Sequence, residues 1–339
     1  VNMDVKVSNI AVIIIAAASL VVVVAGMQAA STIINPFLLS VFLASLCSPP
    51  LYWLQRQGVP NGLAVAIILV GLLVAALLLM LFVGRSVNAL TQQLPVYQER
   101  LGIIMGGLTA WLSSLGVDMT NVLVSDSLSP GKVMSVVYYM VFAFKGLFRN
   151  MFLVFLIVLF ILIEASGFPG KLQAAFPNPE KTLGHFKAMT ASVNQYMGVK
   201  AIFSLATGTL VWLLLALIGV DFAPTWGLLA FLLNFIPNIG SIIAAVPAIL
   251  LALIQLGWPS ALLTMLGYLV VNITIGNFLE PRFMGRRLGL STLVVFLSLL
   301  FWGWVLGPIG MVLSVPLTMI VKIALAANEG TRWVAVLLE

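Results

Sequence analysis

Six stretches of the chain are apolar over the length that a membrane-spanning helix needs, which is ~20 residues. Few charged residues interrupt them, and most charges lie in the segments between. We expect the first stretch to be a retained helix and not a cleaved signal peptide, because it is long and more spans follow it. The pattern predicts an all-α polytopic membrane protein with about six full spans. The predicted spans cover residues 10–27, 33–54, 62–84, 150–167, 201–220 and 260–279.

Two further apolar stretches, in the last third of the chain, are broken in the middle by Pro and Gly. The first begins with residues 225–236, which as a helix would be only ~18 Å long, little more than half of a ~30 Å hydrocarbon core. The segment 237–241 follows, and a second apolar run covers 242–256; the same pattern returns at 292–325. Short helices joined in this way predict two re-entrant helical hairpins with tips at membrane depth. The alternative makes each hairpin two tilted full spans and leaves the loops on the same sides.

Each hairpin follows a full span, so residues 201–256 and 260–325 are two copies of one unit. The first copy starts on the cytoplasmic side and the second on the outer side, which makes them inverted helix-hairpin repeats, an arrangement that forms substrate sites at the repeat interface. We expect the two repeats to move together against a scaffold of the first four spans. The predicted divisions are 1–84 (scaffold spans one to three), 85–149 (outer helical arm), 150–200 (fourth span and cytoplasmic amphipathic segment), 201–256 (helix and hairpin 1), 257–326 (helix and hairpin 2) and 327–339 (cytoplasmic tail).

The long segment 85–149 has apolar residues at three- and four-residue spacing, among them Leu90, Leu94, Tyr97 and Leu101. A second, more apolar helix is expected at 132–147, with turn residues between the two. We predict two long helices that project from the membrane as an arm. The alternative is an amphipathic helix that lies on the lipid surface.

Composition and charge agree with a membrane protein. Of 339 residues, 62% are hydrophobic and 8% are charged, and the mean hydropathy is +1.18, whereas soluble domains are about 25% charged. The net charge of +6 does not require nucleic acid, because Lys and Arg retained on cytoplasmic loops give the same excess. With the N-terminus inside, the short outer loops at 28–32, 221–224 and 257–259 hold no Lys or Arg. Both termini are therefore expected in the cytoplasm.

Cys47 is the single cysteine and His185 the single histidine, so the sequence offers no disulfide framework and no Cys or His metal site. An intramembrane protease would need a base beside its nucleophile or a pair of aspartates. The sequence provides neither, and we expect no enzyme activity, cofactor or bound metal.

The hairpin tips are the candidate site. The first arm of a hairpin ends in carbonyls and the second begins with N–H groups that have no helical partner, and these groups suit a small oxygen-rich solute. Ser241 stands where an N-cap residue belongs, and amides on the next span could face the same cavity. For each Asn or Ser the alternative is a hydrogen bond between helices, worth ~0.6 kcal/mol on average. The candidate residues are Asn234, Asn238, Ile239, Gly240, Ser241, Asn272, Asn277, Gly307, Pro308 and Gly310.

Glu280 ends an apolar span and needs a partner if it lies deep, since an unpaired charge there costs ~2.5–3.5 kcal/mol on insertion scales. Arg282, Arg286 or Arg287 could supply it. The carboxylate would then lock the turn before hairpin 2. The alternative is a direct role in binding substrate or a cation, and Glu280 completes the set of candidate site residues.

Four segments carry a resemblance to a known family: Pro237 to Ser241, Asn277 to Gly285, Leu288 to Gly303, and Gly307 to Pro316, with Ile34-Asn35-Pro36 in the second span. The chain resembles the autoinducer-2 exporter family. The resemblance implies a bacterial inner-membrane transporter that exports the furanone-type quorum signal autoinducer-2. It also implies a homopentamer in which two hairpins hold the substrate and each protomer makes an elevator-like step. Alternatives are a sodium/proton antiporter, as described for some relatives, and a pentameric small-solute channel.

Overall fold

The structure is a computed structural model that describes residues 9–115, 130–132, 134–139, 150–165, 170–171, 174, 179–284, 289–327 and 329–339. Every regular element among these residues is a helix, so the all-α prediction is confirmed. The helices in chain order are α1 (Asn9–Ala29), α2 (Ser31–Arg56), α3 (Asn61–Ser114), α6 (Met151–Ala165), α8 (Pro179–Ile218), α9 (Ala223–Leu233), α10 (Gly240–Leu256), α11 (Trp258–Asn272), the π-helix η1 (Ile273–Leu279), α12 (Glu280–Met284), α13 (Thr292–Leu306), α14 (Pro308–Ala326) and α15 (Arg332–Leu337).

Five helical stretches are long and apolar enough to cross a membrane. Four match predicted spans: α2, α3, the second part of α8, and the run from α11 through η1 into α12. The fifth is α14, the second arm of hairpin 2. The predicted spans at 10–27 and 150–167 coincide with α1 and α6, whose apolar parts are shorter. The chain is thus a polytopic helical membrane protein.

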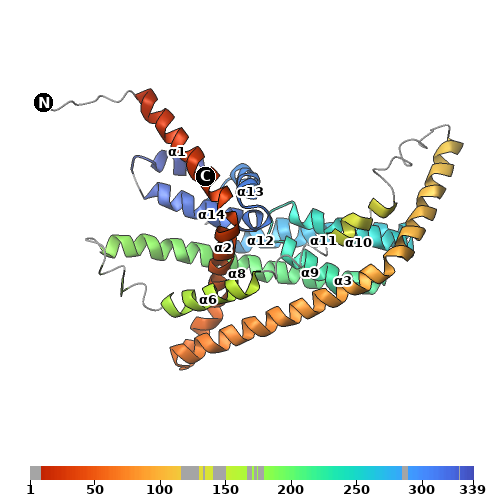
Figure 1. The fold of residues 1–339 in the computed structure, drawn as a ribbon, viewed down its shortest axis with the longest axis horizontal. Helices are drawn as coiled ribbons and strands as arrows, with labels where there is room; N and C mark the ends of the chain where they lie inside the picture. Colours follow the sequence, from red (N-terminus) through yellow and green to blue (C-terminus); the bar gives the residue numbers. More distant parts are fainter. Residues whose placement is uncertain are drawn as a thin grey trace.

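Two helices are longer than predicted. α3 has 54 residues, about 80 Å, and combines the third span with the first helix of the predicted arm. Figure 1 shows it in orange to yellow along one edge of the molecule. α8 has 40 residues and joins part of the predicted cytoplasmic segment to the fifth span. The predicted boundaries at 84/85 and 200/201 therefore fall inside continuous helices.

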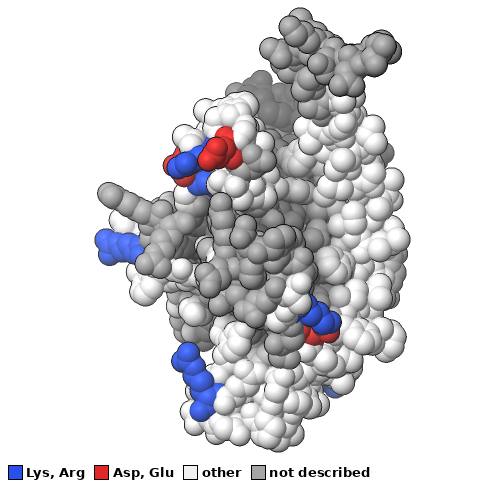
Figure 2. Space-filling model, turned by 90° about the vertical axis from the view of Figure 1, so that its left-hand side faces the viewer, with Lys and Arg blue, Asp and Glu red and all other residues white. Residues whose placement is uncertain are grey.

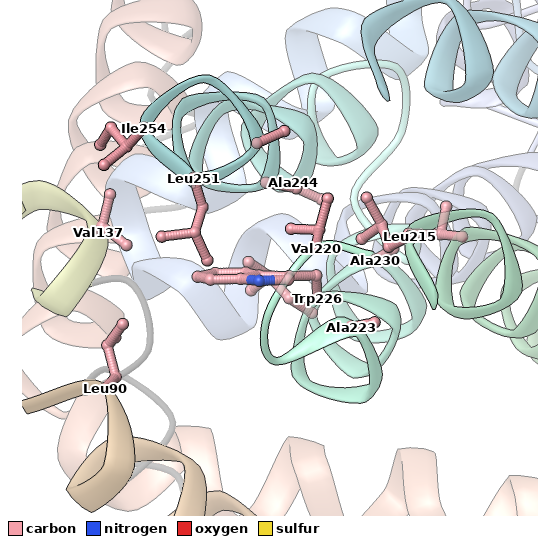
Figure 3. Packing of buried hydrophobic residues seen from close by; sticks show 14 of the residues in the cluster. Leu90, Val137, Leu215, Val220, Ala223, Trp226, Ala230, Ala244, Leu251 and Ile254 are labelled. Carbon is pink, nitrogen blue, oxygen red and sulfur yellow. The ribbon is translucent and has the colours of Figure 1, made fainter. Parts of the chain in front are cut away.

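The largest apolar core joins the second half of α3 to hairpin 1. Leu90, Tyr97 and Leu101 are buried in one cluster with residues of α8, α9, α10 and α11. Its centre is Trp226, whose side chain is fully buried; Figure 3 shows Leu251 beside its indole ring, with Leu90 and Val137 approaching from the arm segment. This part of the apolar face of the predicted arm thus packs on protein. Of its second helix, predicted at 132–147, residues 132 and 134–139 are described and are helical.

Separate cores hold the other helices together. One joins α2, the first half of α3 and α6, and a small cluster seats hairpin 2 against α1 and α2. The face in Figure 2 shows only scattered charged residues among the described atoms.

Candidate functional site

The tip of hairpin 1 is the six-residue turn 234–239 between α9 and α10. The turn pairs its own backbone: Ile236 N–H donates to the Leu233 carbonyl (2.9 Å), Gly240 N–H to Ile236 (3.3 Å) and Ile239 N–H to Pro237 (2.6 Å). The expectation of unpaired carbonyls at this end is therefore wrong for these three groups. Asn238 makes the bend with φ +60°, a left-handed conformation that Asn tolerates better than most residues.

The predicted residues at this tip have different roles. Asn234 is buried and its Nδ2 donates to Ser204 Oγ on α8 (3.0 Å), so its amide joins two helices. Ser241 does not cap α10, because the N-cap residue is Ile239 and no side chain caps this end. Gly240 is required by space: a Cβ there would lie 1.8 Å from the Leu233 carbonyl oxygen.

The tip of hairpin 2 is a single residue, Gly307, between α13 and α14. Its φ of +68° and ψ of −150° belong to a region that is essentially restricted to glycine. Pro308 follows at the first position of α14, where its missing N–H removes no helical bond. Gly310 repeats the role of Gly240, since a Cβ there would lie 1.9 Å from the Trp302 carbonyl oxygen.

Helix α2 brings the two tips together. Asn35 Nδ2 donates to the Leu306 carbonyl at the end of α13 (3.1 Å). Seven residues further along α2, the ring of Phe42 meets Phe235 of the first tip edge-on, with centroids 5.5 Å apart. Seven helical residues span about 10 Å, so both tips approach α2 within two turns. Ile309 packs against the same cluster as Phe42 and Phe235.

Asn35 was not among the predicted site residues. The signal for it was an amide directly before a proline within an apolar span. That signal says nothing of the partner, because the partner is 271 residues away in sequence.

Glu280 lies buried and its Oε1 is 2.6 Å from the Nζ of Lys200. Both side chains are at most 10% exposed. The prediction that Arg282, Arg286 or Arg287 is the partner is wrong with respect to this ion pair: Arg282 is exposed, and Arg286 and Arg287 lie outside the described residues. The pair connects α8 of the first repeat to the end of the span that begins the second.

The π-helix η1 comes immediately before this ion pair. The N–H of Glu280 donates to the carbonyl of Ile275, five residues back, and Pro281 has no N–H to donate. A proline also disfavours the usual α-helical geometry over the preceding turn. The widened turn is thus a local consequence of the sequence, and it sets the position from which Glu280 meets Lys200.

Asn272 is half-buried at the end of α11, and Asn277 is exposed on η1. Neither side chain hydrogen-bonds to any part of the chain that the structure describes, so no bond ties them to the tips. The same part of the chain contains no group of three His, Cys, Asp or Glu residues that could hold a metal ion. Around α2 the structure therefore brings together the two hairpin tips, the Asn35 amide and apolar side chains.

Comparison with known proteins identifies the family. The model of the AI-2E family transporters matches residues 13–330. The chain belongs to this family. This AI-2E family transporter is 42% identical over 314 residues to the AI-2 transport protein TqsA of Escherichia coli (strain K12), with 93% of this chain and 91% of that protein covered.

Other relatives are similar over most of the chain. A putative transport protein of Haemophilus influenzae is 39% identical over 320 residues, covering 93% of this chain and 92% of that protein. The putative transport protein YhhT of E. coli (strain K12) is 39% identical over 314 residues, covering 93% and 90%. The resemblance stated from the motifs is confirmed: this AI-2E family transporter is a multi-pass inner-membrane transport protein and not an enzyme.

Proposed function

We propose that this transporter exports autoinducer-2, or a small hydroxylated solute close to it, from the cytoplasm. The observation that carries the proposal is its 42% identity, over 93% of its length, to a protein named for AI-2 transport. The chemistry of the candidate site supports it. Backbone ends and neutral amides suit a small uncharged solute, and the buried charges in this part of the described chain, Lys200 and Glu280, neutralise each other.

The proposed substrate position is between the two hairpin tips, beside α2. The tips approach the same helix about two turns apart, which leaves a separation that a small solute could bridge. Asn238 and Gly307 bend the chain at these tips. The hairpins are proposed to be re-entrant, and Ser241, Asn272 and Asn277 stay in the proposed site as amide and hydroxyl groups without a hydrogen bond to the described residues.

The proposed movement is an elevator-like step of the repeats within each protomer of a homopentamer, with both termini in the cytoplasm. The proposal rests on the inverted helix-hairpin repeats, 201–256 and 260–325, and on the resemblance to the autoinducer-2 exporter family.

The test is efflux of autoinducer-2 from proteoliposomes that contain the purified protein. The double variant Asn238→Ala/Ser241→Leu is expected to lower efflux at least ten-fold while the protein stays folded as a detergent-stable oligomer. Ser113→Leu is the matched control, because this exposed serine lies at the far end of α3, and it should leave efflux unchanged.

Other outcomes would overturn separate parts of the proposal. Full efflux by a folded tip variant would remove the proposed site. Absence of autoinducer-2 efflux by the wild type, with sodium/proton exchange instead, would replace the substrate. Equal efflux of many unrelated small solutes would indicate a channel.

A further inference from the structure

The side-chain amide of Asn35 is only half satisfied. Its Nδ2 donates to the Leu306 carbonyl at the tip of hairpin 2 (3.1 Å), while its Oδ1 is buried and has no hydrogen-bond partner among the described residues. The orientation of the amide is fixed by chemistry, because a carbonyl oxygen can only accept and must face the nitrogen. The oxygen therefore points into the protein as a free acceptor.

A buried acceptor without a donor costs about 1–3 kcal/mol, and each such group in a native protein needs an explanation. A water or a bound ligand that donates a hydrogen bond would remove this cost. The surroundings favour donors of a particular kind. The end of α13 contributes carbonyl oxygens with partial negative charge, and these repel anions.

Gln28 is a second side-chain amide that hydrogen-bonds to the end of α13, and it can be compared with Asn35. Its Nε2 donates to the Trp304 carbonyl of α13 at 3.4 Å, so it binds the same end of α13 from α1. However, Gln28 is exposed, and solvent or lipid headgroups can satisfy its oxygen. Among the residues that the structure describes, only Asn35 combines a hydrogen bond to α13 with a buried free acceptor.

The position of Asn35 along α2 places it at the proposed substrate site. One turn further, Leu38 and Leu39 pack against the cluster that contains Phe235 of the first tip, and Ile309 of the second tip packs against that cluster too. Asn35 thus lies where both tips approach α2, on the part of α2 that contacts hairpin 2.

We propose that Asn35 is a further substrate-binding residue, whose Oδ1 accepts a hydrogen bond from a hydroxyl group of a neutral solute. Its Nδ2 holds the end of α13 at the same time. This assignment rests on the proposed function and narrows it: the solute must carry at least one free hydroxyl donor and no negative charge at that position.

The test compares wild type with Asn35→Leu, and uses Gln28→Leu as the matched control. The probes are autoinducer-2 and analogues in which one hydroxyl at a time is methylated. For each probe, the KM of efflux and the ligand-induced shift in Tm of the detergent-solubilised protein are measured. We expect Asn35→Leu to raise the KM for autoinducer-2 about ten-fold or more, since removal of a buried hydrogen bond acts in this range, and Gln28→Leu to change it less than two-fold.

The methylated analogues separate binding from a structural role. One analogue should bind the wild type about ten-fold more weakly than autoinducer-2, and Asn35→Leu should abolish this preference. If Asn35→Leu lowers the Tm of the free protein but keeps the preference, Asn35 only supports α13 and the inference is wrong. If Asn35→Leu does not fold, the wild type still decides: equal binding of every methylated analogue overturns the inference.

Two further outcomes distinguish this inference from the proposed function. If autoinducer-2 is not a substrate, a Tm shift with a neutral polyol such as ribose that Asn35→Leu abolishes would still support the Asn35 assignment. If sodium chloride alone gives the shift that depends on Asn35, the acceptor holds a cation and the assignment is overturned.

Discussion

Hairpin 1, formed by α9 and α10, and hairpin 2, formed by α13 and α14, close their arms in the same way. In each, a glycine early in the second arm lies against a carbonyl of the first arm, Gly240 against Leu233 and Gly310 against Trp302. Each second arm also contains a buried proline, Pro247 or Pro316, after the glycine. The contact leaves no room for a Cβ, so a glycine is required where the two arms of each hairpin meet.

The tips themselves are stabilised differently. Hairpin 1 turns over six residues and pairs the carbonyls of Leu233, Ile236 and Pro237 with its own N–H groups. Hairpin 2 turns at Gly307 alone and relies on side chains from other helices, Gln28 and Asn35, for two carbonyls of α13. The first tip is therefore a self-contained turn, whereas the second depends on α1 and α2. Loss of the Asn35 amide should therefore affect the tip of hairpin 2 more than the tip of hairpin 1.

Breaking the ion pair between Lys200 and Glu280 tests how much it contributes to holding the two hairpin units together. Lys200→Met or Glu280→Gln alone leaves a buried partner without compensation, so each should lower the stability by about 3–5 kcal/mol. The double variant should recover part of this loss, because no charge stays buried. Thermal unfolding of the purified protein in detergent measures all three.

The matched control for the ion pair is Lys171→Met. Lys171 pairs with Glu164 where the two side chains are 70% and 54% exposed, and such pairs contribute about 0–1 kcal/mol. A double variant no more stable than the single variants would contradict the assignment of Lys200 and Glu280 as mutual partners.

Adding a methyl group at Gly240 or Gly310 tests the feature that the two hairpins share, which is the close contact between a glycine of the second arm and a carbonyl of the first. Alanine at either position would place Cβ less than 2 Å from a backbone oxygen, and a backbone cannot move aside as a side chain can. We expect each variant to lose about 3 kcal/mol, at the upper end of the range for overpacking, and to lose efflux. The measurements are Tm and proteoliposome efflux.

Gly303→Ala provides the control within hairpin 2. Its Cβ would meet the side chain of Met311 (2.8 Å), which is flexible and can adopt another rotamer. It should cost less than 1 kcal/mol relative to the wild type. Equal losses for Gly303→Ala and Gly310→Ala would show that close backbone approach is not what holds the arms together.

Backbone conformation distinguishes the two tips. Asn238 with φ +60° can become glycine without strain, and Asn238→Ala should cost about 1–2 kcal/mol. Gly307→Ala should cost more, about 2–3 kcal/mol, because its φ and ψ lie where essentially only glycine is found. Tm values for Asn238→Gly, Asn238→Ala and Gly307→Ala rank the three variants by stability. A larger loss of stability for Asn238→Ala than for Gly307→Ala would contradict the prediction.

The sequence was sufficient to predict the turns between α9 and α10 and between α13 and α14, because Pro237, Gly307 and their neighbours act locally. A proline or glycine in an apolar run changes the backbone where it stands, and the turn can be placed without knowing the rest of the fold. The same holds for the apolar spacing of Leu90, Tyr97 and Leu101, which marked the face of α3 that is buried. Its partner, hairpin 1, could not be identified from that spacing.

The missed features depend on residues far apart in sequence. Glu280 has three arginines nearby, yet its partner is Lys200, 80 residues away, because α8 and the end of η1 pack side by side. The division of α3 and α8 into separate elements was wrong for a different reason. A change from apolar to polar residues marks where a helix leaves an apolar environment, but it does not end the helix.

The last prediction concerns a side-chain hydrogen bond that attaches hairpin 1 to α3. Thr225 Oγ1 donates to Ser86 Oγ (2.8 Å), and both residues are buried. Ser86→Ala leaves the Thr225 hydroxyl without this partner and should cost about 1–2 kcal/mol. Ser86→Ala/Thr225→Val removes both hydroxyls and should cost less than the single change, because no buried donor stays unsatisfied. Since hairpin 2 makes no use of this bond, the Asn35-dependent binding of substrate should be the same in both variants. Tm measures the predicted change in stability, and the KM of efflux measures substrate binding. A change in KM would mean that the attachment of hairpin 1 also sets the position of hairpin 2.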